Sequence, residues 1–100
     1  MKKTSVPYKA GLDQDLTDPI EAAAYLNAAL AEESQDVFLM ALRDVADAKG
    51  ITRVARESSL NRENIYRILS EKGNPHLSSL ESLLEAMGLK LAIQVKNEAA

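Results

Sequence analysis

The chain contains no cysteine, no tryptophan and only one histidine among its 100 residues. The absence of cysteine excludes disulfide bonds and thiolate metal sites, and it suits a reducing compartment. The one histidine, His76, follows a proline and has no second histidine or cysteine with which to share a metal ion. We therefore expect neither a metal nor any other cofactor.

Signatures of catalysis, export and membrane insertion are also missing. The four glycines are scattered, so no glycine-rich phosphate loop can form. The pair Ser58-Ser59 has no general base nearby in the sequence. No apolar run is long enough to cross a bilayer, and residues 4–17 lack the continuous apolar stretch of a signal peptide. These absences predict a cytoplasmic protein that is not an enzyme and does not enter membranes.

Charge is unevenly distributed along the chain. The formal net charge is −3, with five Lys and Arg against nine Asp and Glu in residues 1–50, and seven against six in residues 51–100. From Arg53 to Lys72, five basic residues stand against three acidic ones. A hydrophobic content of 46% and a charged content of 27% predict one folded domain. Its basic segment is where we expect a polyanion to bind.

Capping residues and hydrophobic spacing predict two long helices in the first half. Asp18, followed by a proline at the first helical position, starts a helix that ends near Glu33. Ser34 caps a second helix, which Gly50 ends. Residues 1–17 show no sustained period, so we expect an extended N-terminal arm followed by a single domain over residues 18–100.

The segment from Ile51 to Ser70 has the pattern of a helix-turn-helix. Thr52 is expected to cap a short first helix, residues 58–60 form a break, and Asn61 caps a second helix. The outer face of that second helix carries long polar side chains able to reach base edges and phosphates in a major groove: Arg62, Glu63, Asn64, Tyr66 and Arg67. The alternative is an ordinary amphipathic hairpin with a solvated charged face.

The last part of the chain predicts one more helix and then a strand. The helix covers roughly Leu77 to Met87 and is capped by either His76 or Ser78. From Leu89 to Val95 apolar residues alternate with others, which is the period of a half-buried strand. This strand is expected to pair with the arm or with its own copy in a homodimer. The predicted core includes Leu26, Leu42, Val54, Ala55, Leu60, Ile65, Ile68, Leu80, Leu83 and Leu84.

Three stretches carry a family resemblance: DPIEAAAYLNAAL from Asp18 to Leu30, VFLMALRDVADAKGIT from Val37 to Thr52, and GNPHLSSLESLLEAMGLKL from Gly73 to Leu91. With these, the chain resembles the short HigA-like antitoxins, also called probable addiction module antidote proteins, which carry an Xre/Cro-type helix-turn-helix. The resemblance implies an all-α fold, a five-helix Cro/repressor-like helix-turn-helix bundle with a short C-terminal β-strand.

Carried over by position, the family's reading residues fall on Arg62, Glu63 and Arg67, and Asn64 and Tyr66 flank them. Arginine suits a bidentate contact with guanine, glutamate can accept from cytosine, and asparagine can pair with adenine. Besides a base contact, Glu63 could form a salt bridge with Arg67 one turn along the helix.

Two further basic residues are expected to contact phosphates, Arg53 before the turn and Lys72 after the second helix, while the cap Asn61 belongs to the same DNA-binding set. The family usually has glycine where this chain has Ser59. Serine in a left-handed turn costs roughly 1 kcal/mol relative to glycine.

The resemblance implies an antitoxin of a type II toxin-antitoxin module that neutralises a RelE/ParE-like toxin and represses its own operon. The expected partners are double-stranded operator DNA, the cognate toxin and a second copy of the chain. The alternative is a stand-alone protein-interaction module or phage-type regulator without a toxin. Because acid is concentrated in the first half of the chain and such toxins tend to be basic, we expect residues 1–33 to supply much of the toxin contact.

Overall fold

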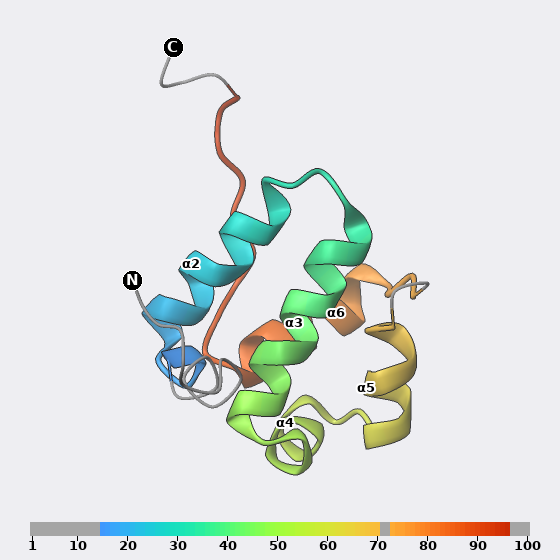
Figure 1. The fold of residues 1–100 in the computed structure, drawn as a ribbon. Coiled ribbons are helices and arrows are strands. Elements are labelled where there is room, and N and C mark those ends of the chain that lie inside the picture. Colours follow the sequence, from blue (N-terminus) through green and yellow to red (C-terminus); the bar gives the residue numbers. More distant parts are fainter. Residues whose placement is uncertain (1–14, 71–72, 97–100) are drawn as a thin grey trace, which may run out of the picture.

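The computed structural model describes residues 15–70 and 73–96 and is helical throughout its regular parts (Figure 1). The helices are α2 (Pro19–Leu30), α3 (Gln35–Lys49), α4 (Ile51–Ser58), α5 (Arg62–Ile68) and α6 (Leu77–Ala86). Asp15 and Leu16 are helical as well. The prediction of an all-α fold with five helices is therefore confirmed for the described residues.

The two long helices α2 and α3 pack against each other as a hairpin, and the predicted caps start both of them. The carboxylate of Asp18 accepts a hydrogen bond from the backbone N–H of Ile20 at 2.9 Å. The hydroxyl of Ser34 accepts one from the N–H of Val37 at 3.4 Å. Each cap satisfies a donor that the first helical turn leaves unpaired. Helix α2 ends at Leu30, slightly before the predicted end.

Gly50 separates α3 from α4 by a single residue. Its φ of +100° favours glycine, while an added Cβ would meet nothing within 4 Å, so conformation rather than crowding is the constraint. Because this one residue ends α3 and starts α4, Thr52 lies inside α4. The prediction that Thr52 is the N-cap is wrong, because α4 already begins at Ile51. Gly50 takes the N-cap position, and no side chain caps this helix.

The core is built from side chains of all the helices described. Of the predicted core residues, Leu26, Leu42, Val54, Ile65, Ile68, Leu83 and Leu84 are buried. Ala55, Leu60 and Leu80 are half-buried and pack against this cluster. Five further large side chains are also fully buried: Leu16, Leu39, Val45, Leu69 and Met87. One continuous core therefore joins all five helices.

The C-terminal segment departs from the expectation. After Gly88 the N–H of Leu89 bonds to the carbonyl of Leu84 at 2.8 Å, and the described residues beyond it, through 96, are exposed and belong to no strand. Ile93 is 99% exposed. The predicted strand from Leu89 to Val95 is wrong: its side-chain alternation is present, but no extended segment of the described chain lies beside it to share backbone hydrogen bonds.

Only the end of the predicted N-terminal arm falls within the described residues. Asp15 and Leu16 are helical there, and Leu16 is 1% exposed, so this part packs into the core. The rest of the arm lies outside the described residues. Among the helices described, none is both long and apolar enough to cross a membrane.

Candidate nucleic-acid interface

A tight turn joins α4 to α5. Ser58 is the last residue of α4 and is buried; its hydroxyl donates to the carbonyl of Ala55 at 3.4 Å and accepts from the N–H of Leu60 at 3.3 Å. Ser59 then takes the left-handed conformation, with φ 65° and ψ 22°. The hydroxyl of Ser58 thus stabilises the reversal of the chain in a place where the backbone alone would leave donors unpaired.

The start of α5 is fixed by its predicted cap. The side-chain oxygen of Asn61 accepts from the N–H of Asn64 at 2.7 Å. The guanidinium of Arg67 donates to the side-chain oxygen of Asn64 one turn along the helix. Arg67 therefore pairs with Asn64 and not with Glu63. The helix thus presents an amide and a guanidinium side by side. The Glu63 carboxylate forms no ion pair with a described residue.

Tyr66 is placed differently from its neighbours on α5. It is half-buried, and its hydroxyl donates to the carboxylate of Asp47 on α3 at 3.3 Å. The guanidinium of Arg43, also on α3, lies over the ring at 5.1 Å from its centroid, within the range of a cation–π contact. Tyr66 therefore attaches α5 to α3, and its ring binds the Arg43 guanidinium at the edge of the predicted reading face.

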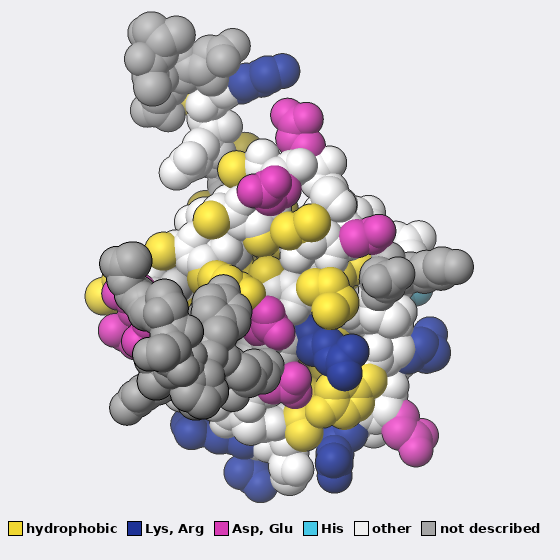
Figure 2. Space-filling model, viewed as in Figure 1, with side chains coloured by type: hydrophobic (Ala, Val, Ile, Leu, Met, Phe, Trp, Pro, Cys, Tyr) yellow, Lys and Arg dark blue, Asp and Glu magenta, His cyan; other side chains and the backbone are white. Residues whose placement is uncertain are grey.

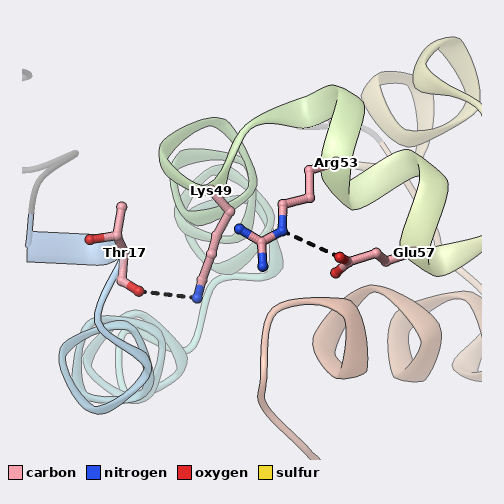
Figure 3. Close-up of polar contacts among 4 residues, drawn as sticks. All are labelled: Thr17, Lys49, Arg53 and Glu57. Atoms are coloured by element: carbon pink, nitrogen blue, oxygen red, sulfur yellow. Dashed lines mark hydrogen bonds and ion pairs between the residues drawn. The ribbon is translucent and has the colours of Figure 1, made fainter.

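Arg53 projects from α4 and is mostly exposed, with 66% of its side chain accessible. Its Nε lies 3.3 Å from a carboxylate oxygen of Glu57, one turn along the same helix (Figure 3). In the same view, the ammonium group of Lys49 donates to the backbone carbonyl of Thr17 at 3.0 Å. Lys49 thus holds the start of α2 against the end of α3, whereas Arg53 keeps guanidinium donors available to solvent.

The exposed side chains of α5 lie at the basic end of the molecule. Figure 2 shows Lys and Arg side chains gathered mainly over the end where Figure 1 places α4 and α5, and Asp and Glu side chains mainly over the rest of this face. Asn61, Arg62, Glu63 and Arg67 are exposed and Asn64 is half-buried. Lys72 lies outside the described residues.

The structure adds two cations to the predicted set. Arg43 on α3 lies over the ring of Tyr66 and so contacts α5. Arg56 on α4 lines a shallow depression together with Asn61 and Arg62. The sequence signal for Arg56 was its place in the basic segment. Arg43 had no such signal, because it stands in the acidic half and reaches α5 only through the packing of α3. Within the described chain, no three His, Asp or Glu side chains gather into a metal site.

Comparison with known proteins gives a family for the chain as a whole. A family model described as "Probable addiction module antidote protein" matches residues 9–95. A protein of Haemophilus influenzae, itself described as uncharacterized, is 33% identical over 81 residues, which cover 81% of this chain and 84% of that protein. No solved structure matches the chain.

Proposed function

Because the chain belongs to the family of probable addiction module antidote proteins, we propose that it is the antitoxin of a type II module and represses its own operon. In this proposal α4 and α5 form a Cro-type helix-turn-helix, α5 enters the major groove, and a RelE/ParE-like toxin is the protein partner. The family is one of antidotes, which favours a regulatory protein over an enzyme.

The observation that carries the DNA-binding part is the two-sided character of α5. Ile65 and Ile68 are buried in the core, while Arg62 and Arg67 point away from it with Glu63 between them in sequence. A short helix held in this way presents its polar side chains on a fixed surface. Such preorganisation lowers the entropy that the side chains lose on binding DNA.

The polar side chains assigned to DNA have different chemical roles in the proposal. Arg62 and Arg67 suit bidentate contacts with guanine, and Glu63 suits an amino group of cytosine. The Asn64 amide, bonded to Arg67, orients that guanidinium or pairs with adenine. Around this reading face, side chains assigned to the backbone of the DNA and to the helix cap are Arg53, Arg56, Asn61 and Lys72.

The proposed assembly is a homodimer, because one short recognition helix reaches too few base pairs for useful specificity. Two copies should place their α5 helices about 34 Å apart, one turn of B-DNA, on a palindromic site. Sedimentation should show a dimer at micromolar concentration. A monomer both with and without DNA would contradict this part of the proposal.

The deciding experiment titrates the chain with DNA from upstream of its own gene and with a scrambled duplex of equal length. We expect the upstream DNA to bind more tightly, and both affinities to fall as salt rises from about 50 to about 200 mM, because phosphate contacts release counterions. Equal and weak binding to both duplexes would instead favour a protein-interaction module whose α4–α5 unit no longer reads DNA.

A further inference from the structure

A second surface of the molecule, between α2 and α3, carries apolar side chains that the fold does not cover. A groove runs between α2 and α3, and on its α3 side lie Val37 and Met40, each 41% exposed. They stand three residues apart on one helix and so project from the same face. The opposite side is built from alanines such as Ala28, whose methyl groups are too small to cover them.

The rim of this groove is acidic. Glu32 and Asp36 line it, both are exposed, and neither forms an ion pair with another described residue. Figure 2 shows hydrophobic side chains gathered over α2 and α3 with Asp and Glu side chains beside them. A polyanion such as DNA is repelled by this arrangement, whereas a cationic protein surface with apolar side chains is complementary to it.

The groove is already formed in the free chain. The hydroxyl of Tyr25 on α2 donates to the carboxylate of Asp44 on α3 at 2.6 Å, across one end of the groove. This bond, together with the packing of α2 on α3, fixes the two walls, so an occupant does not need to separate the helices. Met40 contributes a flexible, polarizable side chain that adapts to the shape of an apolar partner.

We propose that this groove docks an amphipathic helix of the cognate toxin, with apolar side chains against Val37 and Met40 and Lys or Arg side chains toward Glu32 and Asp36. The inference rests on the proposed function, because it takes the toxin as the partner. A second copy of the chain is disfavoured as occupant. On the face that Figure 2 shows, its Lys and Arg side chains gather mainly at the α4–α5 end, and using them here would remove them from DNA.

The two kinds of groove residue should affect binding differently. Exposed charge pairs contribute little affinity but accelerate association in a salt-dependent way, whereas buried apolar contacts slow dissociation. Replacing Met40 with glutamate should therefore raise the dissociation rate. Replacing both Glu32 and Asp36 with their amides should lower the association rate and flatten its dependence on salt.

The experiment measures association and dissociation rates with the purified product of a short reading frame adjacent to this gene, which the proposal takes as the toxin. We expect Met40→Glu to weaken affinity at least about tenfold through dissociation, and the double variant Glu32→Gln, Asp36→Asn to slow association about threefold or more at low salt. Leu77→Glu, at an apolar residue that is 63% exposed on α6, is the matched control and should bind as the wild type does.

Upstream DNA serves as the internal standard, because every groove variant should keep wild-type DNA affinity. Toxin affinity within twofold of wild type for both groove variants would overturn the groove and leave the proposed function standing. A wild-type chain that binds DNA but not the neighbouring gene product would overturn the toxin partner itself, and the groove with it.

Discussion

The α2–α3 hairpin and the α4–α5 pair are built from helices of very different length. The first two have 12 and 15 residues, and the second two have 8 and 7. Isolated helices shorter than about 12–15 residues are marginal in water. Accordingly, α4 and α5 depend on the core side chains Val54, Ile65 and Ile68 and on the contact of Tyr66 with α3. The long hairpin and α6 together hold the short pair in place, because α4 packs against both α3 and α6.

The two regions also differ in charge. The groove between α2 and α3 has a rim of carboxylates, while the exposed guanidinium groups lie mainly over α4 and α5. This separation allows one small domain to present surfaces of opposite sign to two partners. It also explains why the net charge of −3 is compatible with binding DNA: the local field at each surface, and not the sum, guides an approaching ligand.

The largest expected effect tests whether the long hairpin and the short pair share one core. Leu42→Ala in α3 and Ile65→Ala in α5 each remove a fully buried side chain and should lower the free energy of unfolding by about 2–5 kcal/mol. Urea unfolding followed by circular dichroism should show one transition in each variant. Leu77→Ala, at an exposed site, should change the stability by no more than about 0.5 kcal/mol. Two separate transitions would show that α4–α5 unfolds independently of the hairpin.

The next largest effect concerns DNA affinity, which should depend on the α4–α5 pair and not on exposed cations elsewhere in the chain. Arg62→Ala and Arg67→Ala should each weaken binding to upstream DNA by about 1–3 kcal/mol and relax base preference, because each removes a bidentate donor. Fluorescence anisotropy with single-base variants of the site measures both quantities. Lys90→Ala, an exposed cation beyond α6, is the control and should have little effect.

Arg53→Ala is a useful contrast to those two substitutions. It should weaken specific and scrambled DNA alike and reduce the slope of log affinity against log salt by about one, as expected for a phosphate contact. If Arg62→Ala and Arg67→Ala left affinity for the upstream site unchanged, the assigned reading face on α5 would be incorrect.

A smaller effect compares the two tyrosines that join α3 to its neighbours. Tyr25→Phe removes the donor to Asp44, and Tyr66→Phe removes the donor to Asp47. Each should cost about 1 kcal/mol of unfolding free energy, typical of a partly exposed hydrogen bond. Only Tyr66→Phe should also weaken DNA binding, since it loosens α5. A loss of DNA affinity in Tyr25→Phe equal to that in Tyr66→Phe would contradict the separation of the two regions.

The smallest effect concerns the turn. Ser59 has a φ of 65°, which costs a serine more than a glycine, so Ser59→Gly should stabilise the chain by about 0.5–1 kcal/mol. Thermal unfolding measures the gain, and DNA affinity should be unchanged because the turn keeps its shape. A destabilised variant would mean that the serine side chain contributes more to the turn than its backbone strain costs.

Local chemistry explains which parts of the fold could be predicted from the sequence. The caps Asp18, Ser34 and Asn61 were predicted because an Asx or Ser side chain bonds to N–H groups two or three residues away, within the reach of a sequence pattern. The strand from Leu89 to Val95 was predicted wrongly. Alternating side chains are a local property, whereas a strand exists only through hydrogen bonds to a partner that the sequence does not specify.

The candidate site shows the same division. Helical spacing was enough to place Arg62, Glu63 and Arg67 outside and Ile65 and Ile68 inside, as the structure has them. Helical spacing could not place Tyr66, which lies at the border of the two faces. Its orientation is decided by Arg43 and Asp47 on α3, 23 and 19 residues earlier in the chain. Contacts between distant segments therefore decide what local patterns leave open.

Because Tyr25 and Tyr66 each bond to a carboxylate of α3, their spectroscopic signals report on how α3 packs against its neighbours. The sequence has three tyrosines and no tryptophan, so its near-ultraviolet signals are simple to assign. Tyr25 senses the contact between α2 and α3, and Tyr66 senses the contact between α3 and α5. Fluorotyrosine labelling would give three resonances, and those of Tyr25 and Tyr66 would report on these two contacts. The arrival of a ligand at either end could then be followed in a single spectrum without any attached dye.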